Sequence, residues 1–573
     1  MIFNRIILIS VLFFSAIPDN SMDRDLFISP VRIPLLLSAN FGELRIDHFH
    51  SGIDIKTQGV TGKEVVSSSG GYIYRISVAP GGFGKALYIK HPAGYSTVYG
   101  HLDKFSPEIE EFVKERQYER KSYTITLYPP KEKFQVKQGE LIAFSGNSGS
   151  SGGPHLHYEI RRSDNEKPVN PLLFEFGTGD NIDPVIEKLF IYPVSTNTSV
   201  NGKNSIRRID VAGGHGNYYV PAEKEIIING PAGFGIKAFD LLNESYNKCA
   251  VYSIELVIDS MTSYKYVMDE FSFSESRYIN SHIDYETYMR DKIYIQRTYL
   301  LPNDKLKVYK NLVNRGIFLF NDDKIHNVRI TVTDVHNNRS TLAFHVKSQP
   351  DNKLPAIEKN DTNLVTMPFN KQNRFITENI KVTLPAGALY DTLKFSYSIE
   401  AGSDKMLSGI HHVHNKFQPV HRSFSVAIKP DTILRGKESK MLIVQMDDDQ
   451  KKNPLSSTWS DDYLNAEAMS FGSFYIGIDT LPPVISANGL ASDNNLSDRK
   501  EMRIRISDDL SGIKSYEPVI DGNWALFEYD QKNDILVYKF DEKRINRGSD
   551  HFFQLKVIDN KDNISYFNYN FTW

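Results

Sequence analysis

The feature that most restricts the fold is the alternation of short apolar runs with turn-forming residues along almost the whole chain. The runs are rich in aromatic residues, with 31 Tyr and 34 Phe, which favour strands, and clusters of Gly, Asn, Asp and Ser separate them. Residues 107–120 instead carry apolar side chains at helical spacing and predict a helix, and residues 278–289 predict a partly helical stretch. The chain is therefore expected to be mainly β.

Length and composition divide the chain into several domains. At 573 residues the chain is too long for one compact core. We predict a Gly-rich antiparallel β-sheet domain followed by several β-sandwich domains of immunoglobulin-like type. The expected parts are a signal peptide (1–20), the Gly-rich domain (25–178) with an inserted segment near 105–134, a β-sandwich (180–350) with an insertion near 268–310, a β-rich domain (357–480) and a β-sandwich (481–573).

The first and last predicted sandwiches contain similar segments. Residues 236–240 resemble 504–508, and residues 328–334 resemble 554–559. Each segment is a predicted strand that runs into an Asx-type turn. The aspartates that end them could bind calcium, but turn formation is the commoner role of such residues. They are Asp240, Asp334, Asp508 and Asp559.

The N-terminus resembles a secretory signal. Arg5 precedes a mostly apolar run over residues 6–17, which is too short to span a bilayer comfortably. We expect an exported protein, periplasmic or associated with the cell envelope. No later apolar stretch approaches about eighteen residues, so no stable transmembrane segment is expected after signal removal.

Two features of composition exclude classes of function. The 67 basic and 70 acidic residues nearly balance, so the chain lacks the positive field of a nucleic-acid binder. Cys249 is the single cysteine, which excludes disulfide scaffolds and multi-cysteine metal sites within the chain. Its apolar neighbours indicate a small buried residue.

Histidines in the Gly-rich domain suggest a metal site. His155 and His157 alternate on a strand and so share one face. His50 and Asp54 would lie about 13 Å apart on a straight strand, so Ser51-Gly52 must bend the chain, which glycine permits.

The number of ligands indicates the type of metal site. His50, Asp54 and His157 supply three nitrogen or oxygen ligands, and a closed structural zinc site takes four. Three ligands leave a position for water, which is the arrangement of catalytic zinc sites. His101 and His155 are then available as bases or oxyanion donors. Taken singly, each motif also arises by chance, and the other histidines of the chain are expected to be structural or on the surface.

At these residues the sequence resembles the lysostaphin/LytM-type zinc metallopeptidases, which act on bacterial peptidoglycan. The resemblance covers about residues 35–165. It rests on Phe41-Gly42, on the segments that contain the five residues above, on Val136-Lys-Gln-Gly139 and on Gly146-Asn-Ser-Gly149. It implies that His50, Asp54 and His157 bind zinc, that His101 and His155 are catalytic, and that a β-sheet groove takes an extended peptide.

The resemblance leaves alternatives open. We expect a secreted zinc endopeptidase that cleaves peptide bonds in peptidoglycan. A non-catalytic envelope scaffold or activator of other wall hydrolases is the main alternative, since some family members have lost their ligands, although this chain keeps them all. A peptidase for a protein outside the wall is a third possibility. The β domains that follow the Gly-rich domain carry no assigned chemistry; they are expected to position the enzyme and to bind a protein or glycan ligand.

Overall fold

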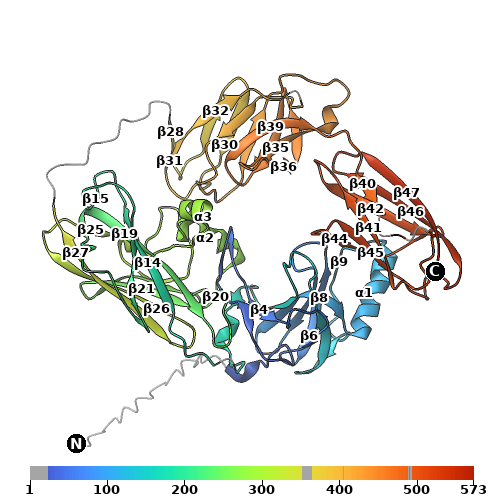
Figure 1. Cartoon of the computed structure of the whole chain (residues 1–573), viewed down its shortest axis with the longest axis horizontal. Helices are drawn as coiled ribbons and strands as arrows, with labels where there is room; N and C mark the ends of the chain where they lie inside the picture. The colour runs from blue at the N-terminus through green and yellow to red at the C-terminus, as the bar shows by residue number, and fades with distance from the viewer. Residues whose placement is uncertain (1–23, 178, 351–363, 404, 488–489, 491–492) are drawn as a thin grey trace, which may run out of the picture.

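The computed structural model describes residues 24–177, 179–350, 364–403, 405–487, 490 and 493–573. The predicted signal peptide lies outside these residues. The described chain is mainly β, as expected, and forms four bodies that follow one another along the sequence (Figure 1).

The first body is built on an antiparallel sheet in the order β1-β4-β12-β8-β7-β6-β10. Its strands are β1 (Leu37–Ala39), β4 (Ile53–Lys56), β12 (His155–Arg162), β8 (Tyr95–Phe105), β7 (Lys85–Lys90), β6 (Gly71–Val78) and β10 (Gln135–Val136). Side chains such as Leu156 and Tyr158 on one face of β12 are fully buried in the core. Since β12 pairs with β4 and β8 along both edges, the opposite face of β12 is held at the centre of the sheet.

The segment inserted into the first body is a helix followed by a strand. Helix α1 (Pro107–Arg120) covers the residues predicted to be helical, and a left-handed Lys121 ends it. Ile109 and Val113 are buried one turn apart, which explains the helical spacing of the sequence. The chain returns as β9 (Ile125–Leu127), which pairs with β6.

The second body, within residues 185–348, is a 14-stranded sheet system that includes two long strands, β19 (Ile227–Leu241) and β27 (Arg339–Ser348). Other strands in it are β14 (Val185–Pro193), β21 (Ser253–Ile258), β22 (Met261–Val267), β24 (Tyr309–Leu312) and β26 (Ile325–Thr333). The helices α2 (Ile279–His282) and α3 (Tyr285–Asp291) lie in the stretch predicted to be partly helical. Cys249 is free and buried.

The third body contains two five-stranded sheets and a two-stranded sheet of β28 (Val365–Met367) and β31 (Leu393–Phe395), and the fourth body consists of two four-stranded sheets. The third contains β29-β30-β34-β38-β37 and β32-β33-β39-β35-β36, and the fourth contains β40-β41-β45-β44 and β43-β42-β46-β47. Bounds in the third body are β29 (Asn373–Ile376), β30 (Ile380–Leu384), β34 (Phe424–Ile428), β38 (Tyr463–Ala468), β37 (Ser457–Ser460), β32 (Tyr397–Glu400), β33 (Ile410–Val413), β39 (Gly472–Ile478), β35 (Met441–Met446) and β36 (Lys452–Leu455). Bounds in the fourth are β40 (Val484–Ser486), β41 (Glu501–Ser507), β45 (Ile535–Lys539), β44 (Phe527–Asp530), β43 (Asn523–Trp524), β42 (Ile513–Ile520), β46 (Asp550–Asp559) and β47 (Ile564–Thr572).

The four bodies are arranged in a ring, and the fourth body returns to the first beside α1 (Figure 1). The buried Lys85 of β7 forms a 3.0 Å ion pair with Glu528 of β44. Tyr118 of α1 packs edge-on against Trp524, with 5.3 Å between the ring centroids. Lys532, in the turn between β44 and β45, donates to the carbonyl of Ser151 at 3.0 Å. The ring is therefore closed by packing and ionic contacts between segments about 400 residues apart.

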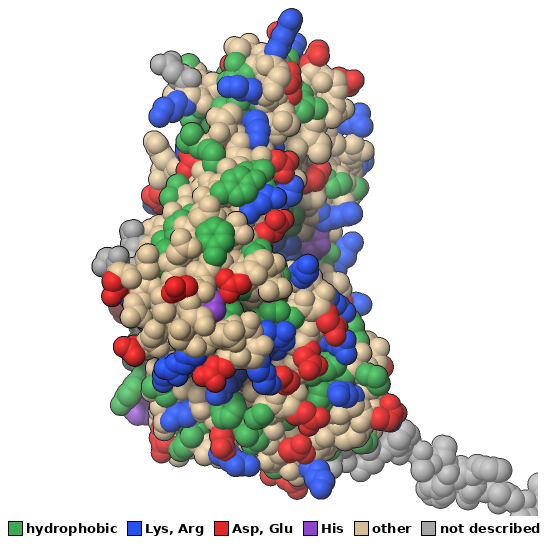
Figure 2. All heavy atoms as spheres, turned by 90° about the vertical axis from the view of Figure 1, so that its right-hand side faces the viewer, with side chains coloured by type: hydrophobic (Ala, Val, Ile, Leu, Met, Phe, Trp, Pro, Cys, Tyr) green, Lys and Arg blue, Asp and Glu red, His purple; other side chains and the backbone are tan. Residues whose placement is uncertain are grey.

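The surface of the fourth body carries both signs of charge. Figure 2 shows acidic and basic side chains interspersed over this side of the molecule, with no extended patch of one sign. This agrees with the balanced composition of the chain. Among the helices that the structure describes, none has the length and apolar character needed to cross a bilayer.

Candidate metal centre

Three of the predicted site residues meet at the centre of the first sheet. His50 Nε2 lies 3.0 Å from Asp54 Oδ1 and 3.1 Å from His157 Nδ1. His157 Nδ1 is 2.8 Å from the same Asp54 oxygen. All three side chains are buried, so two nitrogens and one oxygen converge on one point, the donor set that suits zinc.

The remaining nitrogens of the two imidazoles are bound by acceptors. His50 Nδ1 donates to the carbonyl of Asn40 at 2.8 Å, and His157 Nε2 donates to Glu159 Oε1 at 2.9 Å. Since a neutral imidazole has one N–H, these bonds leave His50 Nε2 and His157 Nδ1 with lone pairs for a cation. The tautomers set by the surroundings therefore fit metal binding.

The electrostatics of the centre favour a cation. Burial opposes ionisation of the Asp54 carboxyl, but the neighbouring histidines hold its pKa well below the usual range. Burial also lowers the pKa of His157, but hydrogen bonds to Asp54 and Glu159 outweigh it and raise that pKa to about 9. The centre therefore stabilises positive charge, either on an imidazole or on a bound ion.

His101 and His155 lie beside this centre. His155 Nε2 is 3.5 Å from Asp54 Oδ1, and the ring centroids of His101 and His155 are 4.8 Å apart. His101 Nδ1 donates to the Ser148 carbonyl and His155 Nδ1 to the Gly153 carbonyl, each at 2.9 Å. Both neutral rings thus have an unprotonated Nε2 that can accept a proton. Burial, followed by unfavourable electrostatic interactions with the neighbouring imidazoles, lowers the pKa of His101 to about 3.

Close backbone approaches position these side chains. A Cβ at Gly52 would lie 2.3 Å from the Tyr158 carbonyl oxygen, so glycine is needed where the chain bends before β4. A Cβ at Gly100 would lie 3.3 Å from the Phe83 ring, which stacks on His157 at 4.8 Å between centroids. The bend expected at Ser51-Gly52 thus brings His50 back toward Asp54.

Two residues that support the centre were not assigned a role from the sequence. Glu159 accepts from His157 Nε2, and its position two residues along the same strand was the available signal. Asn40 places its carbonyl on His50, while its side chain exchanges two 2.8 Å hydrogen bonds with Ala250 of the second body. No local sequence pattern indicates this second contact, because the two residues are 210 positions apart.

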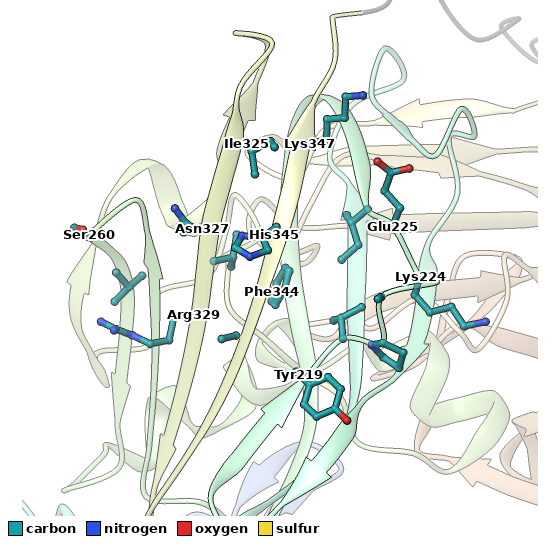
Figure 3. Close-up of a pocket in the computed structure, with 17 residues that line it drawn as sticks. Tyr219, Lys224, Glu225, Ser260, Ile325, Asn327, Arg329, Phe344, His345 and Lys347 are labelled. Atoms are coloured by element: carbon teal, nitrogen blue, oxygen red, sulfur yellow. The ribbon is translucent and has the colours of Figure 1, made fainter.

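A cavity of about 880 Å³ lies elsewhere, on the second body (Figure 3). Tyr219, His345, Lys347 and Arg329 are among its lining residues, and they come from several strands of that body. It shares no residue with the histidine centre and contains no convergent set of metal ligands. The candidate functional site is therefore the buried His-Asp-His centre.

Two family models match this chain. The model of peptidase family M23 matches residues 48–118 and 125–171, and a Zu5-like domain model matches residues 365–479. An uncharacterized metalloprotease of Haemophilus influenzae is 33% identical over 146 residues, which cover 25% of each chain. The DD-carboxypeptidase/endopeptidase Mpg of Neisseria meningitidis is 35% identical over 123 residues, or 22% of each chain.

Another relative is named for a different activity. The murein hydrolase activator NlpD of Salmonella typhimurium is 31% identical over 125 residues, covering 22% of this chain and 26% of NlpD. Among solved structures, a zinc containing peptidase from Vibrio cholerae aligns at 26% identity and a TM-score of 0.20, covering 26% of this chain and 40% of the other.

The match to the model of peptidase family M23 is confined to the N-terminal part of the chain. The chain spans about a quarter of the length of the curated relatives it matches. The family model includes His50, Asp54, His101, His155 and His157 within its two matched ranges. The N-terminal region of this chain is therefore a peptidase family M23 domain of the LytM/lysostaphin type.

Proposed function

We propose that the chain is an exported zinc-dependent endopeptidase that hydrolyses peptide bonds in bacterial peptidoglycan. The observation that carries the proposal is the convergence of His50 Nε2, Asp54 Oδ1 and His157 Nδ1 within 3.1 Å of one another, with two further histidines beside them. The relatives named for murein or for carboxypeptidase/endopeptidase activity support a wall peptide as substrate.

The proposed ligands are His50, Asp54 and His157. When bound there, zinc would supply the Lewis acidity that polarises a peptide carbonyl. Asp54 is held as a carboxylate by its neighbours, and Arg45 binds its second oxygen at 2.9 Å. These contacts fix the carboxylate for binding without requiring a change of rotamer.

His155 and His101 are the proposed catalytic histidines. The Nε2 of His155 faces the centre and is not protonated in the tautomer that Gly153 selects, so His155 can take a proton from the attacking water. His101, held in the same tautomer by Ser148, is placed to share that proton and to donate a hydrogen bond to the oxyanion once protonated. The two rings are close enough to exchange these roles.

The test is digestion of purified sacculi with zinc-loaded protein, followed by mass spectrometry of the released muropeptides. We expect cleavage by the wild type and a fall to background in His157→Ala. His48→Ala is the matched control, because His48 is exposed, lies two residues from His50 and directs its Nδ1 to the Ile46 carbonyl rather than to the centre. Equal fragments from wild type and His157→Ala would refute the proposal.

Two other outcomes separate the alternatives. If the zinc-loaded protein shows no cleavage of its own and instead stimulates a second wall hydrolase, the chain is an activator, as the name of NlpD describes that relative. Cleavage of casein but not of cross-linked muropeptides would identify a peptidase for proteins outside the wall. Substrate competition between the two measures this preference directly.

A further inference from the structure

A second group of metal-ligand side chains lies where the first body joins the second. We call Asp180, Asp240, Asp334 and His336 the junction cluster. Ligand atoms of Asp180, Asp334 and His336 lie within 4.8 Å of one another. Asp180 belongs to the connector before β14, Asp240 to β19, and the other two to the loop between β26 and β27. The cluster therefore joins the connector to two elements of the second body.

Three atoms of the junction cluster are buried without a hydrogen-bond partner. They are Asp180 Oδ2, Asp240 Oδ1 and His336 Nδ1. Asp240 is only 2% exposed. The expected Asx turn does not form at Asp240, which lies within β19. A buried polar atom without a hydrogen-bond partner is destabilising, so three such atoms on neighbouring side chains indicate a missing partner.

The cluster also lacks a compensating positive charge. Burial raises the pKa of Asp240 to about 8, and the nearby charges of Asp334 and Asp180 add to this effect. Within the described residues, no lysine or arginine forms an ion pair with any of the three carboxylates. A cation bound among them would satisfy both the open oxygens and the charge.

The fourth body contains the same turn and provides an internal comparison. Asn338 donates from its backbone N to Asp334 at 2.8 Å and from its side chain to the Asp180 carbonyl at 3.1 Å. Asn563 makes the equivalent bonds to Asp559 at 2.8 Å and to the Asp479 carbonyl at 3.2 Å. The two junctions are thus built alike.

The copies differ in the groups beside the carboxylates. Counted from the equivalent turns, Lys561 stands in the fourth body where His336 stands in the second. Asp479 and Asp559 are among the charges acting on the Lys561 ammonium, and Lys440 Nζ lies 2.7 Å from Asn563 Oδ1. In this copy, ammonium groups supply positive charge that the junction cluster lacks.

A cavity of about 330 Å³ gives access to the junction cluster. Asp180 and His336 line it together with apolar side chains that include Leu36, Leu172 and Leu242. It is large enough for a hydrated ion to enter.

We propose that the junction cluster binds one divalent cation of the class that takes carboxylate oxygens together with an imidazole nitrogen, zinc or manganese. Asp180 and His336 each offer an unpartnered ligand atom, and Asp334 supplies a third ligand atom within 4.8 Å of both. The buried carboxyl of Asp240 lies near these three groups and interacts electrostatically with the two aspartates. A purely oxygen-binding ion such as calcium takes six to eight oxygens and no imidazole. The bound ion would fix the connector against the second body.

The test is the zinc content of the full chain after loading and desalting. We expect two zinc ions in the wild type, one in Asp54→Ala, one in Asp180→Asn and none in the double variant. The control is Asp508→Asn in the fourth body, which should retain two. Zinc should also raise the melting temperature of Asp54→Ala but not that of the double variant.

The outcomes separate this proposal from the proposed peptidase centre. If wild type and Asp54→Ala each hold one zinc ion and Asp180→Asn holds none, the result would support the junction cluster and refute zinc at the peptidase centre. If Asp54→Ala binds neither zinc nor manganese, the proposal that the junction cluster binds a metal is wrong. If it binds one equivalent of calcium instead, the proposed class of metal is wrong. If Asp180→Asn fails to fold, His336→Ala, which alters a partly exposed side chain, serves instead.

Discussion

At the scale of single residues, the peptidase centre depends on groups that never touch the metal position. Glu159 is fully buried, accepts from His157 Nε2 and is paired with Arg161 at 2.5 Å. It therefore fixes both the orientation of His157 and the nitrogen left for a cation. Burial opposes its ionisation, but Arg161 and His157 lower its pKa to about 2.

We expect Glu159→Gln to weaken zinc binding about 10- to 100-fold, the usual effect of losing a partner of a metal-binding histidine. The amide keeps the shape of the side chain but removes the charge that selects the tautomer of His157. Competition with a chelator of known affinity measures the change. Glu166→Gln is the control, since Glu166 also pairs with Arg161 but makes no contact with His157. Equal affinities in wild type and Glu159→Gln would contradict the assignment.

The residues of the centre were largely predictable, whereas their supports were not. Alternation along one strand placed His155 and His157 on one face, and the structure keeps that arrangement on β12. The role of Asn40 depends on Ala250, 210 residues away, and no local pattern encodes such a contact. His336 was expected to be structural or on the surface, and its proximity to Asp180, which lies 156 residues earlier in the chain, has no local sequence signal.

At the scale of elements, the centre is held by close pairing of β4, β12 and β8. His157 is opposite Asp54 on one side and Gly100 on the other. This pairing gives a rigid base for the two loops that carry Phe83 and Ser148. Helix α1 and the strands of this body were predictable because their apolar spacing is local.

We expect Gly52→Ala to lower the free energy of unfolding by about 1–3 kcal/mol, as overpacking typically does. The added methyl group would meet the Tyr158 carbonyl at 2.3 Å, so β4 and β12 must move apart. Gly152→Ala is the control, because a Cβ there meets nothing within 4 Å and its φ is not positive. Urea unfolding measures the free energy of unfolding of both variants, which can be compared when their m-values agree. Equal stability of the two variants would contradict the packing argument.

At the scale of the whole molecule, a buried ion pair helps to close the ring. Lys85 is 6% exposed and Glu528 is 25% exposed at their side chains. Burial opposes ionisation of Glu528, but Lys85 and Lys539 lower its pKa to about 2. This closure had no counterpart in the sequence prediction, because it depends on groups 443 residues apart.

Acid should therefore weaken the contact between the first and fourth bodies. A carboxyl with a lowered folded pKa contributes stability above its unfolded pKa of about 4.3, and this contribution is lost as the pH falls toward about 2. We expect the radius of gyration from X-ray scattering to rise over this range. Glu528→Gln should show a larger radius already at neutral pH, whereas Glu517→Gln, whose partner Lys556 lies in the same body, should not. A radius independent of pH and of Glu528 would contradict this role.

Ring closure also constrains how the molecule can flex. In a row of domains with free ends, each connection between two domains can bend independently. In a closed ring of domains, a rotation at one connection requires compensating rotations at the others. A change of angle at the connector around Asp180 would therefore be transmitted to the turn that carries Lys532 and, through its bond to Ser151, to the loop next to His155. The second, third and fourth bodies therefore restrict the motion of the loop beside the histidines. The stiffness of each connection between bodies determines how far that loop can move.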